Sequence, residues 1–337
     1  MKEHSVTLAH GSGGQAMAGL IRELFLEIFD DPELARLEDQ ARLESPAGKL
    51  AMTTDASVID PIFFPGGDIG KLAVCGTVND LAVGGARPLY LSCAFILEEG
   101  LPLADLRRIA SSMKAAAARA GIRIVTGDTK VVPRGAADKV FITTCGVGEI
   151  PPGVNLGAAN IRPGDRILIS GFIGDHGAAV LDARGELALE HTLESDCRPL
   201  NHLVAHLLSA CPNGVHALRD PTRGGVAAVL NEFAQTCGHC LRLRETELPM
   251  REAVRGMCEI LGLDPLYLAN EGKLVAVVAP KIAETALAAL RDHPDGRDAA
   301  IVGEVTETPS GMVILHTIFG GERIVDLPMG EQLPRIC

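Results

Sequence analysis

The sequence ends in a cysteine, Cys337, at the tip of the stretch GEQLPRIC. The residues from Pro328 onward contain two prolines, one glycine and no periodic apolar pattern, so they predict a mobile tail that packs against nothing. A free cysteine is only a few per cent thiolate near pH 7. The adjacent C-terminal carboxylate disfavours the anion further, and Arg335 offsets part of this effect. We therefore expect a thiol with a specific purpose but poor intrinsic activation.

Four aspartates stand in apolar or glycine-rich surroundings: Asp55 in LAMTTDASVI, Asp80 in GTVNDLAVGGARP, Asp128 in VTGDTK and Asp220 in DPTRGG. A charge in apolar sequence is costly to bury unless a partner compensates it. Any one of these aspartates alone is better explained as a helix cap or an Asx turn. The four together predict metal ligands in a magnesium–nucleotide site, because Mg²⁺ bridges dispersed carboxylates to phosphate oxygens.

Two glycine-rich stretches, HGSGG and the turn in DPTRGG, offer backbone N–H groups to the phosphates of ATP. The chain contains no GxxxxGK[ST] pattern, which excludes a P-loop. For Lys71 the alternative is a solvated lysine on a helix. The predicted nucleotide-binding residues are His10, Gly11, Ser12, Gly13, Gly14, Thr54, Lys71, Asn79, Gly127, Thr129, Thr222, Arg223 and Gly224.

Two residues have the chemistry for proton transfer. Glu271 stands directly before an apolar strand in NEGKLVAVV, and Lys130 follows a turn expected at Asp128. Partial burial or a neighbouring charge moves either pKa toward neutrality. The alternative for Glu271 is a carboxylate in water at the end of a strand or helix.

The pattern CGHC, from Cys237 to Cys240, resembles a redox dithiol. A redox dithiol of this kind opens a helix after a strand, whereas here the pattern follows an apolar helical segment. We therefore interpret it as a helix end. His10 and His176 have no second ligand at metal-site spacing and are interpreted as turn or helix-start residues.

Composition excludes several classes of protein. The net charge of −12 and the 3% aromatic content argue against a nucleic-acid partner. No basic, apolar and small-residue succession marks a signal peptide, and no apolar run reaches membrane-spanning length. We therefore expect a cytoplasmic protein with reduced cysteines and no membrane partner.

Strand-like runs at about 50–59, 122–126, 140–147, 166–170, 273–279 and 299–305 alternate with helical patterns at about 69–84, 102–121, 224–236 and 282–292. Several neighbouring strands lack a crossover helix between them, which favours mixed sheets in an α/β (α+β) protein rather than a Rossmann sheet. We expect a glycine-rich segment and helix over 1–42, domains over 43–155 and 162–327 separated by a Pro/Gly-rich linker, and the tail over 328–337.

Taken together, the segments FPGGDIGKLAVCGTVNDLAVGGARPLYLS, VTGDTKVVPRG, GDHG, DPTRGG, NEGK and the terminal PRIC resemble the HypE family of hydrogenase maturation proteins, or carbamoyl dehydratases. The stretch DLAVGGARP also resembles the wider PurM-like superfamily of aminoimidazole ribonucleotide synthetase. This resemblance covers essentially the full chain. It implies a two-domain PurM-like fold and a homodimer whose N-terminal strands form a shared barrel, with ATP and Mg²⁺ in a cleft near the interface.

The resemblance also implies a purpose for the thiol. A carbamoyltransferase, HypF, loads a carbamoyl group onto Cys337, ATP-dependent dehydration turns it into a thiocyanate, and the cyano group passes to iron on a HypC–HypD complex. Glu271 and Lys130 occupy positions associated in this family with proton transfer. The ten-residue tail extends about 30 Å, enough to reach both the cleft and a partner.

Two other functions stay open at the level of sequence. One is phosphotransfer to a small molecule, as in selenophosphate synthetase or thiamine-monophosphate kinase, which needs no terminal cysteine. The other is a redox or scaffold role through CGHC, which needs no ATP.

Overall fold

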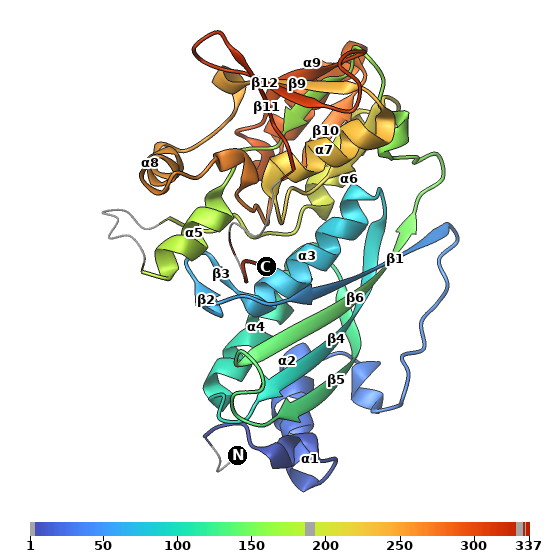
Figure 1. Ribbon diagram of the computed structural model, residues 1–337. Coiled ribbons are helices and arrows are strands. Elements are labelled where there is room, and N and C mark those ends of the chain that lie inside the picture. Colours follow the sequence, from blue (N-terminus) through green and yellow to red (C-terminus); the bar gives the residue numbers. More distant parts are fainter. Residues whose placement is uncertain (1–3, 186–192, 328–332, 334) are drawn as a thin grey trace.

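The computed structural model describes residues 4–185, 193–327, 333 and 335–337. It contains two sheets, each covered by helices, with the C-terminus between them and the N-terminus at the far end of the first unit (Figure 1). The expectations for residues 328–332 and 334 lie outside the described residues.

The N-terminal unit is a four-stranded sheet in the order β1-β6-β4-β5. Its strands are β1 (Lys49–Ser57), β4 (Arg87–Glu98), β5 (Arg123–Val132) and β6 (Val140–Ile150). Strands β4 and β5 are parallel and the other pairs antiparallel, so this sheet is mixed. Parallel neighbours need a long crossover, and α4 (Leu103–Ala120) supplies it.

Helix α3 (Ile69–Val83) begins where the Asp68 side chain accepts hydrogen bonds from the backbone N–H groups of Gly70 and Lys71. Such a cap satisfies donors that have no partner within the helix. Nearly every residue of α3 is buried, because the helix lies between the first sheet, α4 and the second unit. It therefore joins the two units, and Asp80 near its C-terminal end lies at their boundary.

The segment before β1 forms short helical turns beside β5 and α4. They are η1 (Leu8–Gly11), α1 (Gln15–Leu20), η2 (Ile21–Leu26), α2 (Glu27–Phe29) and η3 (Leu34–Arg36). The short strands β2 (Phe63–Phe64) and β3 (Gly67–Asp68) form a hairpin before α3.

The C-terminal unit is a seven-stranded mixed sheet in the order β13-β12-β9-β11-β7-β10-β8. Its strands are β7 (Arg166–Ile169), β8 (Val215–Arg219), β9 (Cys240–Arg244), β10 (Val275–Val278), β11 (Ala300–Thr306), β12 (Val313–His316) and β13 (Glu322–Ile324). Its helices are α5 (Asp175–Ala183), α6 (Asn201–Ala210), α7 (Gly225–Cys237), α8 (Glu252–Leu261) and α9 (Ala283–Asp292). Short 3₁₀ turns connect them: η4 (Ala158–Asn160), η5 (Glu245–Glu247), η6 (Pro265–Tyr267), η7 (Pro280–Ile282) and η8 (Pro294–Gly296).

Helices cover both faces of this second sheet. In β10, Val275 and Val277 pack on the side of α7, while Ala276 and Val278 pack on the side of α6 and α9. Alternate residues of a strand point to opposite faces. A strand buried on both faces therefore appears in sequence as the unbroken apolar run VAVV.

The expectation of a two-domain α/β fold with mixed sheets is confirmed. One local expectation is wrong: β5 continues through Val132, so Asp128 and Lys130 lie within a strand and not at a turn. Gly127 and Asp128 suggest a turn by residue type, but pairing with β4 holds this segment extended.

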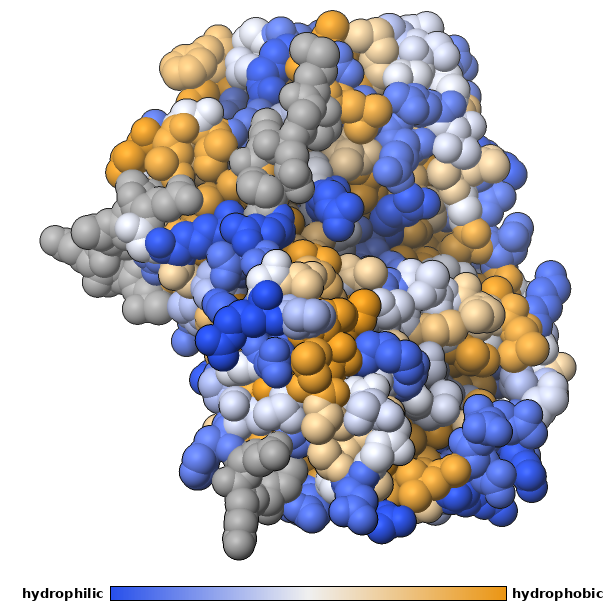
Figure 2. Space-filling model, turned by 60° about the horizontal axis from the view of Figure 1, so that its bottom comes forward, coloured by the Kyte–Doolittle hydropathy of each residue, from blue (hydrophilic) through white to orange (hydrophobic). Residues whose placement is uncertain are grey.

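Seen from its base, the molecule has a surface on which small apolar and charged patches alternate (Figure 2). In the part of the chain that the structure describes, no helix is both long enough and apolar enough to cross a membrane.

Candidate functional site

The end of the tail is docked between the two units, which corrects the expectation that it packs against nothing (Figure 1). Ile336 pairs with Ile59 in an antiparallel bridge just beyond β1, and its side chain is only 4% exposed. The backbone N–H of Val58 donates to the carbonyl of Cys337 at 3.2 Å. A long-range strand pairing of this kind leaves no mark in the local sequence of the tail.

Docking places the Cys337 thiol in a largely buried position, where Arg223 Nη2 lies 3.7 Å from its sulfur. Burial, and then the neighbouring Glu271 carboxyl, raise the pKa of the Cys337 thiol to about 12. The poor activation expected from the sequence is therefore present, but desolvation is its main cause. The docked sulfur is suited to bear a group already attached to it rather than to attack as a thiolate.

Glu271 is buried, with 2% of its surface exposed, so the alternative of a carboxylate in water is wrong. Its backbone N–H donates to Asp196 Oδ1 at 3.0 Å, and its carbonyl accepts from the N–H of Arg198 at 3.1 Å. One carboxyl oxygen, Oε1, has no hydrogen-bond partner among the described residues. Burial, and then the charge of Asp220, raise the pKa of Glu271 well above its ordinary value. A fixed carboxyl of this kind is suited to general acid–base work.

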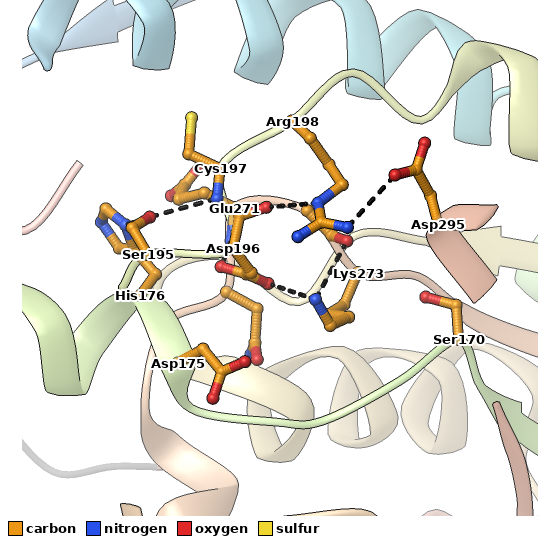
Figure 3. A network of polar contacts seen from close by, with 12 residues as sticks. Ser170, Asp175, His176, Ser195, Asp196, Cys197, Arg198, Glu271, Lys273 and Asp295 are labelled. Atoms are coloured by element: carbon orange, nitrogen blue, oxygen red, sulfur yellow. Dashed lines mark hydrogen bonds and ion pairs between the residues drawn. The ribbon is translucent and has the colours of Figure 1, made fainter. Parts of the chain in front are cut away.

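A buried polar network holds this carboxyl in place (Figure 3). Lys273 Nζ contacts Asp196 Oδ2 at 3.1 Å, and Arg198 reaches Asp295 at 3.1 Å. A Cβ added at Gly272 would lie 1.9 Å from the carbonyl oxygen of Asp196, so only glycine fits there. Sequence reasoning missed Asp196 and Lys273, although a lysine inside the apolar run GKLVAVV is the signal that marks the site.

Three of the predicted metal ligands lie together beside Glu271. Thr53 Oγ1 donates to Asp80 Oδ2 at 3.0 Å, and a cleft of about 590 Å³ between β1, α3 and α7 is lined by Asp80, Asp220 and Arg223. Burial, and then the charge of Asp80, raise the pKa of Asp220 to about 7. Desolvation, with Asp55 adding its charge, also raises the pKa of Asp80.

The residues in this cleft fit a magnesium ion bound together with phosphate. No group of three His, Cys, Asp or Glu side chains in the described ranges is arranged to hold a metal ion, but Mg²⁺ takes one or two carboxylates and fills its shell with water and phosphate oxygens. Asp220 Oδ2 is buried without a hydrogen-bond partner in the described structure. A cation would offset the mutual repulsion of Asp80 and Asp220, so these two would hold it, with Asp55 nearby.

The fourth predicted ligand, Asp128, is not part of this cluster within one chain. Strands β1 and β5 form opposite edges of the first sheet, and Asp128 is exposed and paired with Lys130 Nζ at 2.7 Å. The predicted proton-transfer residue Lys130 is thus likewise separated from Glu271. The first glycine-rich stretch lies on the same side, because a Cβ at Gly11 would meet the backbone nitrogen of Val131 at 2.8 Å.

Gly13 and Gly14 precede α1, and Ser12 Oγ donates to the Ala9 carbonyl. The imidazole Nδ1 of His10 accepts from the backbone N–H of Thr7, as expected for a turn residue. Gly127 and Thr129 stand in β5 beside Asp128.

The remaining predicted nucleotide-binding residues divide into two groups. Thr222, Arg223 and Gly224 form the turn before α7, and Thr222 and Arg223 line the cleft. In contrast, Asn79 is buried, and its side chain bonds to the N–H of Leu200 and the carbonyl of Arg198. It therefore joins α3 to the segment before α6.

Lys71 Nζ donates to the Gly66 carbonyl at 2.7 Å, and Thr54 Oγ1 donates to the Thr144 carbonyl. Neither of these side chains faces the cleft as it is lined here.

The CGHC stretch lies at a helix end, as expected. Cys237 ends α7, Gly238 adopts the left-handed conformation, and Cys240 begins β9 as a buried residue. All nine cysteines are free thiols.

Replacing Asp220 by asparagine is expected to stabilise the protein above pH 7 and to flatten its stability between pH 4 and 7. The native pKa of about 7 exceeds the unfolded value of 3.8, so the native state binds more protons and loses stability as pH rises through this window. We expect a gain of about 2–4 kcal/mol at pH 7.5 and no gain at pH 4, measured by urea unfolding. The exposed Asp292→Asn variant is the control, and an equal effect of both variants would contradict the assignment.

The comparisons with known proteins agree with this geometry. Family models described as AIR synthase related protein, N-terminal domain, and AIR synthase related protein, C-terminal domain, match residues 37–150 and 162–316. The carbamoyl dehydratase HypE of Rhodobacter capsulatus is 58% identical over 342 residues, which cover 100% of this chain and 99% of that protein. The chain belongs to the HypE carbamoyl dehydratase family.

Solved HypE structures have the same fold. A hydrogenase maturation protein HypE in complex with ATP matches with a TM-score of 0.93 and 52% identity, over 98% of this chain and 99% of that chain. A chain from a HypE–HypF complex matches with a TM-score of 0.81 and 49% identity, over 92% of this chain and 99% of that chain. The two-domain HypE fold expected from the sequence thus extends over the whole chain.

Proposed function

We propose that this chain is a carbamoyl dehydratase that acts on its own C-terminus, converting S-carbamoyl-Cys337 into S-cyano-Cys337 with ATP and supplying the cyanide ligands of NiFe hydrogenase iron. The supporting observation is the position of the terminal sulfur: Cys337 is docked against the buried carboxyl of Glu271, which is the first charge to shift its pKa. An enzyme that acts only on small molecules has no use for a docked terminal thiol.

The chemistry follows from the poor leaving group of a carboxamide. Loss of water would expel oxide or hydroxide, so the carbamoyl oxygen first attacks the γ-phosphate of ATP, releasing ADP, while the nitrogen loses one proton. The C–O bond then breaks, phosphate leaves, and the second N–H proton departs as the C≡N bond forms. A positioned base speeds each proton loss, and Glu271 is the base that this chain places beside the sulfur.

The cleft next to Glu271 has the charges that a phosphoryl transfer requires. Arg223 lies 3.7 Å from the sulfur and lines the cleft, where it offsets negative charge developing on the transferring group. When bound, Mg²⁺ would neutralise charge on the ATP phosphates from Asp80 and Asp220. The backbone N–H groups at the start of α7 face the same cleft and favour an anion there.

Lys130 and Asp128 enter the site only if a second copy brings them there. The uncovered face of the first sheet exposes apolar residues, with Met52 75% and Leu50 61% exposed. Its edges β1 and β5 are open to pairing with another chain. A homodimer that joins these edges in a shared barrel would bring the β5 residues of one copy to the cleft of the other.

The partners follow from the same proposal. HypF loads Cys337, consistent with the HypE–HypF complex of a relative, and a HypC–HypD complex accepts the cyano group. The free thiols suit a reducing, cytoplasmic location.

The decisive experiment follows the mass of the intact chain. After incubation with HypF, carbamoyl phosphate and ATP, the wild-type chain should gain a carbamoyl group and then lose one water, whereas Cys337→Ser should do neither. A Cys237→Ser/Cys240→Ser variant should behave as wild type, which separates the proposal from a redox role. If Cys337→Ser retained full activity in hydrogenase maturation, a phosphotransferase acting on a small molecule would be the better description.

A further inference from the structure

We propose that His176 and Ser195, together the tail latch, bind the main chain of the docked C-terminus and set how Cys337 is shared between the catalytic cleft and the loading partner. The proposal rests on the function proposed above, and it concerns residues that take no part in the bond changes. In this proposal His176 is a positioning residue that acts through the backbone of Ile336.

The geometry of the imidazole defines its role. His176 is fully buried, with Nε2 2.7 Å from the Ile336 carbonyl and Nδ1 2.8 Å from Ser195 Oγ. A carbonyl oxygen only accepts, so Nε2 must bear the hydrogen. Ser195 Oγ accepts from the N–H of Cys197 at 3.1 Å and gives its own hydrogen to Nδ1. Burial lowers the pKa of His176 and thereby favours this neutral ring.

Each of these bonds is complete only when the tail is docked. Withdrawal of Ile336 leaves a buried N–H of His176 without the acceptor it has here, and a buried donor without a partner destabilises the state that contains it. The latch therefore favours the docked tail. Because it contacts the backbone, it senses the position of the tail rather than the identity of its side chains.

A second contact supports the latch from the other side. Arg184, just after α5, donates from Nη2 to the Arg335 carbonyl and from Nε to the Asp60 carbonyl, both at 2.9 Å. The N–H of Asp60 also donates to the Arg335 carbonyl at 3.3 Å. Consecutive carbonyls of the tail, at Arg335 and Ile336, are thus bound by two side chains from the region of α5.

The latch is attached directly to the part of the chain that holds the base. Ser195 binds the imidazole, and the next residue, Asp196, accepts the backbone N–H of Glu271 at 3.0 Å (Figure 3). The Ser195 N–H donates to the Pro65 carbonyl at 2.9 Å, which fixes this stretch to the β2–β3 hairpin. Two consecutive residues therefore hold the tail and the carboxyl in register, so the latch also sets the distance between Glu271 and the sulfur.

This arrangement has opposite consequences for the two half-reactions. Loading by another protein requires the tail to leave, whereas dehydration requires it to be docked. A weaker latch should therefore slow dehydration without slowing loading. A residue with only a structural role would impair both steps together.

The test uses the full-length chain with His176→Ala and with His176→Gln, whose amide N–H can still donate to Ile336. The first readout is the rate at which iodoacetamide alkylates Cys337, followed by peptide mass mapping. We expect about tenfold faster alkylation in His176→Ala, the effect of losing one buried hydrogen bond and leaving its partners unsatisfied. We expect partial return toward wild type in His176→Gln. The exposed His206→Ala is the matched control and should match wild type.

The second readout uses chains already carbamoylated at Cys337. Single-turnover loss of water with ATP should be about tenfold slower in His176→Ala, while the rate of loading by HypF should not fall. Unchanged alkylation in a folded His176→Ala chain, or equal slowing of both half-reactions, would overturn the proposal.

Two further outcomes are assigned in advance. If His176→Ala does not fold, Arg184→Ala takes its place, and an unchanged alkylation rate there overturns the proposal in the same way. If the wild-type chain fails to lose water with ATP while alkylation still responds to His176→Ala, the proposed function is wrong and the latch stands.

Discussion

Replacing Glu271 by glutamine is expected to slow the loss of water from carbamoylated Cys337 by about 10²–10⁴-fold, the usual contribution of a positioned general base. Glutamine keeps the size of the side chain but cannot accept the proton from the carbamoyl nitrogen. Loading by HypF should be unchanged, because that step takes place with the tail away from the cleft. Intact-mass measurement of a single turnover with ATP distinguishes the two steps.

The matched control is Glu232→Gln, which alters an exposed glutamate lining the same cleft. Equal rates for Glu271→Gln and wild type would remove Glu271 from the mechanism. The pH profile gives a second check, since a base works only when ionised. Burial raises the pKa of Glu271, so the wild-type rate should rise with pH through that raised pKa, and the rise should be absent in Glu271→Gln.

Replacing Lys273 by methionine is expected to destabilise the protein by about 3–5 kcal/mol, the cost of breaking a buried ion pair and leaving one charge unpaired. Both side chains are nearly inaccessible, at 6% for Lys273 and 1% for Asp196. Burial alone would raise the pKa of Asp196, but Lys273 and the Glu271 N–H hold it below its ordinary value. Urea unfolding at neutral pH measures the loss.

The control for this prediction is Arg166→Met, which breaks the partly exposed pair of Arg166 with Glu304 and should cost less than about 1 kcal/mol. Adding Asp196→Asn to Lys273→Met should recover part of the lost stability, because it removes the unpaired charge. Similar losses for Lys273→Met and Arg166→Met would show that the buried pair has no special weight.

The parts of the fold that depend on local pattern are predictable from the sequence. The strand at β1, helices α3, α4 and α7, and the helix end at CGHC follow from apolar periodicity and from glycine and proline positions. Glu271 is predictable because a carboxylate directly before an apolar strand is costly unless it has a purpose. Asp128 was misplaced because GDTK has the residue types of a turn, whereas pairing with β4 decides its conformation.

The features that the sequence did not reveal depend on contacts between distant segments. The bridge from Ile336 to Ile59 joins the last residues to the first sheet, and the pair of Lys273 with Asp196 joins segments 77 residues apart. Local propensity contains no information on such pairs. The separation of Lys130 from Glu271 likewise becomes visible only when strand order places β1 and β5 at opposite edges.

The docked terminus also bears on how the protein can be handled. The Cys337 carbonyl is bound by Val58 and its sulfur lies in a largely buried position, so residues appended after Cys337 would have to thread out of the crevice or pull the thiol from it. An affinity tag or fluorescent fusion at this end would thus disable the molecule it reports on. The opposite terminus, at the far end of the first unit, is the place for such labels (Figure 1).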